Sequence, residues 1–433
     1  SGRRWHRHTA AMLRLSMLRV RYYKRCVSMF LALSVLCCGN GGHAAGSAGV
    51  DVWTWVHRAF APAAHHRVQQ PLVAARVAAG AADRLGARRV LEALDERPAD
   101  LVWFTSGRAV EDRALTGLEE SLGGAGWERV KGKIEPPEGG APGLARIARR
   151  LLPEVWSARK KLKEHESQFL LGLGGFSALA PVLAARSLGI PCGWLEVNTV
   201  SGRATRALAP LCQQVWHAWE ETSRGTSADE VVGPPLAAEL FLEGDVEEAK
   251  ATREGLGFDP ERPLLVILGG SQGALGLNRF IASHAQALVE GGLSVLHQCG
   301  PGRTGEGAGD LDSYQAVEFI EDVPRLLAAA ELALARSGAS TVAELGAARL
   351  PAVFVPHPAS PDRHRHRNAG LLGAGARVVD ERDLDESCVQ LLIQLGGVAG
   401  AEERAQMRAV LNGKVPRDGA RRVAQALTKR LSS

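Results

Sequence analysis

The cysteines of this chain lack any spacing typical of a metal site or a disulfide framework. Seven cysteines, an odd number, are spread over 433 residues, and none forms a CxxC pair. A secreted disulfide scaffold or a structural zinc site needs paired, regularly spaced cysteines. The sequence therefore favours a reduced, cytosolic protein with free thiols.

The chain also lacks an apolar run of transmembrane length in its hydrophobic N-terminal stretch. Residues 29–38 (MFLALSVLCC) span ten positions, whereas a membrane-spanning helix needs about 20. The preceding basic region is too long for a signal peptide, although the outline is similar. Three interpretations stay open for residues 1–66: an export or anchoring signal, a membrane-surface arm, or an extension ahead of the first domain. The signal-peptide criteria that the stretch fails favour the extension.

Positive charge is scarce in the body of the chain. The net charge is +5, but residues 1–66 hold nine Lys and Arg against one acidic residue, so the remainder carries a net −3. A nucleic-acid-binding body would concentrate basic residues on one face, so we expect no nucleic acid among the partners. With 45% hydrophobic and 23% charged residues, the chain is long enough for two or three globular domains.

The most informative stretch, residues 264–280 (LLVILGGSQGALGLNRF), contains neither a P-loop nor the dinucleotide-binding glycine motif. Its five apolar residues predict a buried strand, its paired glycines a tight turn, and the spacing from about Ala274 a helix. A helix start after a glycine turn offers free N–H groups and a positive dipole end to a phosphate. The alternative is a plain tight connection.

Strands and helices alternate in two parts of the chain, which predicts an α/β fold of two doubly wound, Rossmann-like domains. The predicted strands are 72–79, 101–105, 168–171, 264–268, 293–297, 317–320, 332–335, 352–355 and 377–379. The predicted helices are 84–96, 275–290, 324–330, 340–349 and 363–373. A Gly-Pro-Pro linker at 233–235 divides an N-terminal domain, 67–232, from a C-terminal domain, 233–433.

Three strings in the second half resemble those of a known family. Residues 269–278 (GGSQGALGLN), 335–345 (ARSGASTVAEL) and 364–376 (HRHRNAGLLGAGA) resemble the C-terminal half of the MurG-type glycosyltransferases. The resemblance implies a GT-B fold and inverting transfer of N-acetylglucosamine from UDP-N-acetylglucosamine to an undecaprenyl-linked muramyl peptide in peptidoglycan synthesis. It also implies a peripheral place on the cytoplasmic face of the bacterial inner membrane, and no cofactor.

The same resemblance implies a donor site at the carboxyl ends of the C-terminal strands. A glycine-loop phosphate site, the backbone of Ile320 at the uracil and Glu344 at the ribose hydroxyls would bind UDP. Glu344 has a second interpretation, because Thr341 to Glu344 reads as a capping box. Arg365 stands where the family usually has Gln, which indicates that it binds phosphate instead of the sugar or that the donor differs. The charged residues 364–367 are equally interpreted as a solvated helix start. The implied substrate-binding residues are Gly270, Ser271, Gln272, Gly273, Asn198, Ile320, Ser337, Gly338, Glu344, His364, Arg365 and Asn368.

The N-terminal half departs from the family pattern. The family's glycine-rich loop ends in His, whereas residues 78–83 here read AAGAAD and end in Asp83. The family's His-Glu-Gln-Asn string reads LEVN at 195–198, and it retains only Glu196 and Asn198. By position alone, Asp83 and Glu196 are the candidate catalytic residues. Ala237 replaces an arginine that helps hold the diphosphate in the family.

These changes keep two alternatives open. One is a related GT-B transferase with a different nucleotide sugar or acceptor. The other is a catalytically silent scaffold that binds the nucleotide.

Two further segments have competing interpretations. Residues 147–163 (IARRLLPEVWSARKKLK) combine Trp, apolar and basic residues, which suits an anionic membrane surface or an ordinary helix with a solvated face. The Asp-Leu-Asp strings at 310–312 and 383–385 resemble metal-binding motifs, but short motifs match by chance, and we interpret these residues as loop and cap residues. Fixed helix dipoles can stabilise a leaving diphosphate without a cation, so we predict no metal.

Overall fold

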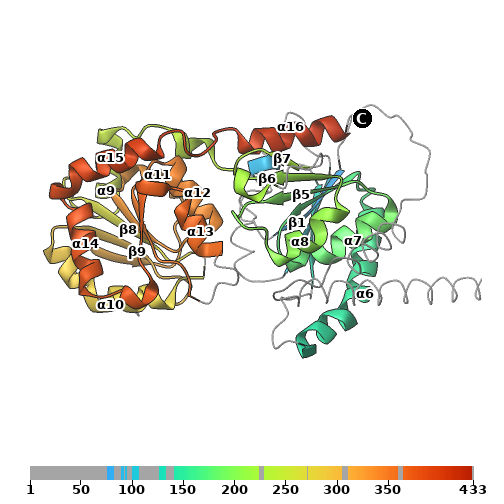
Figure 1. Cartoon of the computed structure of the whole chain (residues 1–433), viewed down its shortest axis with the longest axis horizontal. Coiled ribbons are helices and arrows are strands. Elements are labelled where there is room, and N and C mark those ends of the chain that lie inside the picture. Colours follow the sequence, from blue (N-terminus) through green and yellow to red (C-terminus); the bar gives the residue numbers. More distant parts are fainter. Residues whose placement is uncertain are drawn as a thin grey trace, which may run out of the picture.

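The computed structural model of the chain describes residues 76–81, 89–91, 93–94, 100–106, 126–132, 141–223, 229–270, 272–304, 311–358 and 364–431. These residues form two lobes side by side, each with a parallel sheet covered by helices (Figure 1). The α/β fold with two doubly wound sheets is confirmed. Asp83 and Ser271 lie outside the described residues.

The N-terminal sheet has the strand order β3-β2-β1-β4-β5-β6-β7. Its strands are β1 (Arg76–Ala81), β2 (Asp100–Thr105), β3 (Gly126–Lys131), β4 (Phe169–Leu173), β5 (Cys192–Glu196), β6 (Gln214–His217) and β7 (Asp229–Val231). The helices α6 (Ala141–Glu164), α7 (Leu179–Leu188) and α8 (Arg203–Leu208) belong to this lobe. Side chains alternate between its two faces: Val102 and Phe104 join one core, and Leu101 and Trp103 the other.

The C-terminal sheet has the order β10-β9-β8-β11-β12-β13. Its strands are β8 (Leu264–Leu268), β9 (Ser294–Gln298), β10 (Tyr314–Val317), β11 (Leu332–Ala335), β12 (Ala352–Phe354) and β13 (Ala376–Val378). Its helices are α9 (Val246–Gly255), α10 (Leu275–Glu290), α11 (Val323–Ala329), α12 (Ala339–Ala347), α13 (His364–Gly370), α14 (Glu386–Gly396) and α15 (Ala401–Leu411). Every residue of β8 is buried, because helices cover both faces of the sheet.

One predicted strand is misplaced. The prediction of 317–320 is wrong, since β10 covers Tyr314–Val317. Tyr314 pairs with Val295 of β9 in the parallel register, whereas Phe319 beyond the strand is 38% exposed. The apolar pair Phe319-Ile320 therefore belongs to the loop that follows the strand.

The last helix, α16 (Gly419–Leu431), leaves the C-terminal lobe and lies along the N-terminal one (Figure 1). Its apolar side chains Val423, Ala424 and Leu427 are buried in the same core as Trp103 and Trp216. The chain thus crosses between the lobes twice. The crossings touch, because a Cβ on Gly419 would stand 2.3 Å from the carbonyl oxygen of Pro234. The boundary expected at 232/233 lies between β7 and the first crossing, and it stays a prediction.

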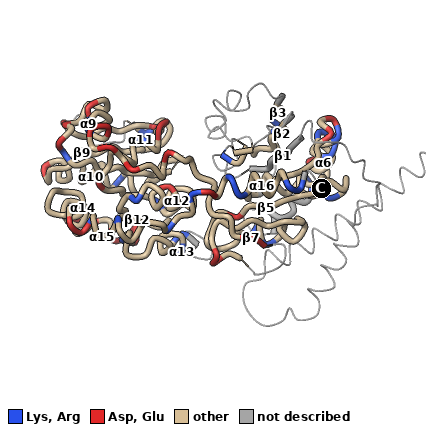
Figure 2. Tube along the Cα trace, turned by 90° about the horizontal axis from the view of Figure 1, so that it is seen from above, with Lys and Arg blue, Asp and Glu red and all other residues tan. Residues whose placement is uncertain are grey.

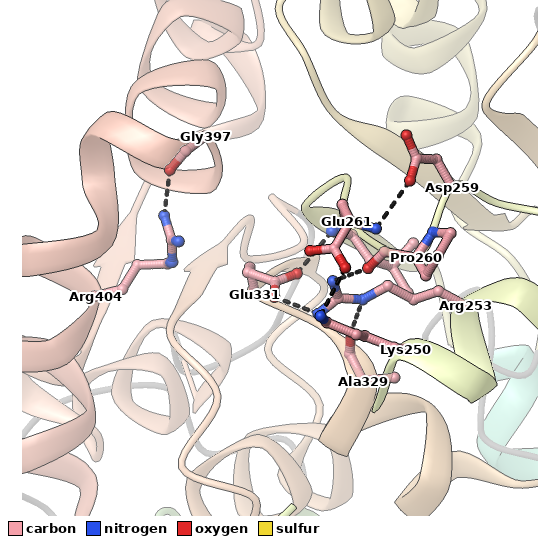
Figure 3. Close-up of polar contacts among 10 residues, drawn as sticks. Lys250, Arg253, Asp259, Pro260, Glu261, Ala329, Glu331, Gly397 and Arg404 are labelled. Carbon is pink, nitrogen blue, oxygen red and sulfur yellow. Dashed lines mark hydrogen bonds and ion pairs between the residues drawn. The ribbon is translucent and has the colours of Figure 1, made fainter. Parts of the chain in front are cut away.

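A polar cluster fixes the amino-terminal end of the C-terminal sheet (Figure 3). Arg253 of α9 donates to the carbonyls of Ala329 (2.8 Å) and Pro260 (3.0 Å) and pairs with Glu331. Glu331 in turn accepts a hydrogen bond from the backbone N–H of Leu264 at 2.7 Å. The cluster joins α9, the end of α11 and the first residue of β8, and the Arg253 and Glu331 side chains are only 11% and 19% exposed.

Replacing Arg253 by Met should lower the free energy of unfolding by about 3 kcal/mol, because it removes the charged partner of a largely buried carboxylate. Urea unfolding measures the loss. The matched control is Lys250→Met on the same helix, whose partner Glu261 is 71% exposed, and it should change stability little. Equal losses for the two variants would contradict the assignment.

Candidate functional site

The two central strands of the C-terminal sheet bring two helix starts together. β8 and β11 are neighbours at the point where the strand order reverses, and Leu268 pairs with Ala335 at their carboxyl ends. Helix α10 follows β8 and helix α12 follows β11. Their N-cap residues, Ala274 and Gly338, provide no side-chain cap. Two uncapped helix N-termini beside one another are a candidate anion-binding position at the switch point of the sheet.

Backbone packing shapes the glycine loop that leads into α10. Gly270 and Gly273 have φ values of 80° and 68°, which favour glycine. A Cβ on Gly273 would stand 2.0 Å from the carbonyl oxygen of Cys299. Conversely, a Cβ on Gly300 would stand 2.6 Å from the backbone nitrogen of Gly273. The loops after β8 and β9 therefore touch backbone to backbone. Gln272, which lies between Gly270 and Gly273, is exposed.

A buried polar chain holds these two loops in register. Asn278, in the first turn of α10, donates to the carbonyl of Cys299 at 2.9 Å and contacts Nε2 of His297 at 3.2 Å. The other ring nitrogen of His297 contacts the hydroxyl of Tyr314 at 3.0 Å. Burial lowers the pKa of His297 to about 4, so this histidine is neutral at physiological pH.

The structure corrects the capping-box interpretation of Glu344. Helix α12 begins at Ala339, and its N-cap is Gly338, so Thr341 lies inside the helix and caps nothing. Glu344 is a half-buried residue of α12 in the turn after its start. This placement leaves the ribose-binding role as the prediction for Glu344.

Arg336 was not predicted from the sequence, although it directly follows β11. Its side chain is 9% exposed. It donates to the carbonyl of Val355 at 3.1 Å and pairs with Glu381 at 2.6 Å. Since Ser337 and Gly338 come next, this buried cation stands at the start of α12. The sequence did contain a signal for this residue, because an arginine directly follows a predicted buried strand and precedes Ser-Gly.

Asn368 joins the two lobes. Its Oδ1 accepts hydrogen bonds from the backbone N–H and the hydroxyl of Thr199, at 3.1 and 2.7 Å. Its Nδ2 donates to Asn198 and to the carbonyl of Ser337, both at 3.4 Å. Asn368 is buried, and Thr199 belongs to the loop after β5. The predicted substrate contacts Asn198 and Asn368 therefore meet one another, at the rim that Ser337 occupies.

Glu196 is engaged in holding that same loop. Oε1 accepts from the backbone N–H and the side-chain amide of Asn198, both at 2.9 Å. Oε2 accepts from Thr205 at 2.5 Å and from the backbone N–H of Gly202 at 3.2 Å. These four bonds to a carboxylate that is 4% exposed favour a positioning role over proton transfer. The catalytic prediction for Glu196 gains no support from its contacts.

The remaining predicted residues lie in segments that follow strands of the C-terminal sheet. Ile320 follows β10 and is partly buried against the core that contains Val342. His364 and Arg365 open α13, and the side chain of His364 lies outside the described residues. Asp385 caps α14 by accepting from the N–H of Ser387, as predicted for a cap residue. The absence of a metal stays a prediction.

Comparison with known proteins assigns the family. Residues 264–411 match the glycosyltransferase family 28 C-terminal domain. A relative from Halorhodospira halophila, the UDP-N-acetylglucosamine--N-acetylmuramyl-(pentapeptide) pyrophosphoryl-undecaprenol N-acetylglucosamine transferase, is 35% identical over 348 residues, 77% of this chain and 91% of the relative. The chain belongs to the MurG family.

A second relative agrees with this membership, and a solved structure agrees with the fold. A relative of the same name from Sorangium cellulosum is 33% identical over 364 residues, 81% of this chain and 84% of the relative. The crystal structure of Acinetobacter baumannii MurG aligns with a TM-score of 0.60 at 23% identity, over 82% of this chain and 99% of that one. The predicted family and its GT-B fold are confirmed.

The buried His297 makes folding of this MurG-family chain sensitive to acid. The unfolded chain binds a proton at this residue below about pH 6.5, whereas the folded chain stays neutral down to about pH 4. Stability is therefore lost as the pH falls between these values. His297 should contribute a loss of about 2 kcal/mol between pH 7 and pH 5.

Urea unfolding of wild type and His297→Gln at both pH values measures this contribution. Gln cannot titrate, so the variant should lose about 2 kcal/mol less than wild type over the same interval. An equal pH dependence in both proteins would contradict the assignment.

Proposed function

We propose that this chain transfers N-acetylglucosamine from UDP-N-acetylglucosamine to an undecaprenyl-linked muramyl peptide, with inversion at the sugar. The observation that carries the proposal is the pair of uncapped helix starts aligned by β8 and β11. Membership of the MurG family supports the donor and acceptor, because the relatives carry this activity in their names.

The chemistry needs stabilisation of negative charge on the departing UDP. The acceptor hydroxyl oxygen forms a bond to the anomeric carbon, while the carbon–oxygen bond to the β-phosphate breaks and its electron pair passes to the phosphate oxygen. The acceptor proton leaves to a base or to water. Helix starts that are fixed before the reaction stabilise the developing charge without reorganisation.

The donor would lie on the C-terminal lobe, with its diphosphate over the glycine loop and its ribose at Glu344. The acceptor would approach from the N-terminal lobe. Glu196 and Asn198 would position the loop that meets Asn368 of the donor lobe, so closure of the lobes would exclude water from the donor. Asp83, which follows β1 in the sequence, stays a candidate catalytic residue by position alone.

Acceptor-dependent release of UDP tests the proposal directly. The full chain is mixed with UDP-N-acetylglucosamine and a short-chain lipid-linked muramyl peptide, and the disaccharide product is identified by mass spectrometry. Release of UDP with a different sugar donor or acceptor would identify a related transferase. Binding of UDP without product would identify the silent scaffold.

Two glycine variants test the location of the site. Gly273→Ala should lower kcat/KM at least tenfold, because its Cβ collides with the carbonyl of Cys299 and shifts the phosphate loop. Gly292→Ala shares the positive φ, 90° against 68°, but its Cβ meets nothing within 4 Å. It should retain kcat/KM. Circular dichroism controls for folding, and equal activity of the two variants would contradict the placement.

We propose that α6 binds the cytoplasmic surface of the bacterial inner membrane. Figures 1 and 2 both place α6 on the N-terminal lobe, away from the C-terminal lobe. Its buried face includes Leu151 and Val155, whereas Arg149, Trp156 and Lys160 are exposed at helical spacing. Among the described residues, no helix has the length and apolar character needed to cross a membrane. Basic and aromatic side chains on one helix face suit an anionic lipid surface.

Trp156→Ala should weaken binding of the full chain to phosphatidylglycerol vesicles about tenfold, because 56% of this indole is exposed for insertion. Vesicle sedimentation measures the affinity. Val398→Ala is the control, since Val398 is 80% exposed on the C-terminal lobe and should bind as wild type does. Unchanged binding of Trp156→Ala would remove α6 from the membrane surface.

A further inference from the structure

Two arginine side chains lie next to the N-termini of α10 and α12. Arg365 of α13 places Nη1 3.2 Å from the position that a Cβ on Gly338 would take, at the N-cap of α12. Arg336 places Nη2 3.0 Å from the Cβ position of Gly276, in the first turn of α10, where the carboxylate of its partner Glu381 lies closer still. Each cation therefore lies against the start of one of the two helices, where backbone N–H groups already favour an anion.

The two arginines differ in what neutralises them. Arg336 pairs with Glu381 at 2.6 Å and donates to the carbonyl of Val355. Arg365 has no hydrogen bond or ion pair to the residues that the structure describes. It is nevertheless half-buried. Burial and the neighbouring charge of Arg336 lower the pKa of Arg365, so this cation is desolvated without a described counter-charge.

Buried donors at the same turn also lack acceptors. The hydroxyl of Ser337 is fully buried, and neither it nor Nε of the 9% exposed Arg336 has a hydrogen-bond partner in the described part of the chain. Leaving buried polar groups unpaired costs free energy, so native proteins rarely do it without a reason. Donors of this kind, grouped at helix N-termini, fit a ligand made of acceptor oxygens.

We propose that Arg365 is a diphosphate-binding residue, which closes over the UDP moiety of the donor from α13. This inference rests on the proposed function and assigns one contact within it. A guanidinium binds two phosphate oxygens at once in a fixed planar geometry. Arg336, already paired with Glu381, positions the site, and Arg365 supplies the positive charge that the ligand neutralises.

Isothermal titration of UDP and of uridine to the full chain tests the assignment. Arg365→Gln should weaken UDP binding between about tenfold and 100-fold, the usual effect of losing a charged hydrogen bond. Uridine has no phosphate, so its affinity should not change. Arg365→Lys keeps the charge without the planar fork and should fall between Gln and wild type. Arg367→Gln, an exposed residue two positions along α13, should bind UDP as wild type does.

Each remaining outcome overturns the assignment in a recognisable way. If Arg365→Gln binds UDP as wild type does but loses affinity for UDP-N-acetylglucosamine, the arginine contacts the sugar. If uridine binding falls as much as UDP binding, the substitution has altered the fold of the site. If wild type binds neither UDP nor UDP-N-acetylglucosamine, the proposed function itself fails.

Discussion

The parallel pairing of β8 with β11 is the constraint on which the rest of the C-terminal lobe depends. Because Leu268 and Ala335 are in register, the two strands end at the same level of the sheet. A shift of one residue would turn the following side chains to the opposite faces of the sheet. The glycine loop, the Arg336 side chain and the start of α12 hold their relative places only while this register persists.

Charged side chains are paired at one end of the C-terminal sheet and only partly paired at the other. At the amino-terminal end, Arg253 and Glu331 satisfy one another and the neighbouring backbone, which stabilises the fold. At the carboxyl end, helix dipoles, Arg336 and Arg365 gather positive charge, of which Glu381 neutralises only part. An excess of charge of one sign destabilises the folded state through repulsion. A bound ligand of opposite charge relieves that repulsion. The stabilising ion pair and the proposed binding site thus lie at opposite ends of the same sheet.

Local patterns predicted the C-terminal lobe closely. The strand at 264–268 and the helix at 275–290 coincide with β8 and α10, because an apolar run, two glycines and a helical period all agree there. The prediction of a strand at 317–320 was wrong. Phe319 and Ile320 are apolar, but they lie in the loop that follows β10. The capping box failed since any Thr-x-x-Glu string fits the motif, while the N-cap depends on where the preceding strand ends.

Contacts between distant segments were beyond local patterns. Nothing near Thr199 indicates its bonds to Asn368, 169 residues away, and nothing near Glu196 indicates that its carboxylate is fully occupied. The sequence does place Arg336 and Arg365 in separate motifs. Only the fold brings both side chains to the paired helix starts, since α13 returns to the rim from which α12 departs.

The second crossing of the chain has a consequence for how the protein is made. The ribosome completes the N-terminal sheet early, yet Trp103 and Trp216 share a core with Val423 and Leu427 of α16, which is synthesised only after the C-terminal sheet. Domains usually fold as they emerge from the ribosome, the N-terminal one first. Here one face of the first sheet lacks the cover of α16 until the C-terminal lobe and then α16 have been synthesised. Helix α16 thus belongs to the core of the first lobe although it is synthesised after the second, and apolar surface left uncovered in that interval favours aggregation.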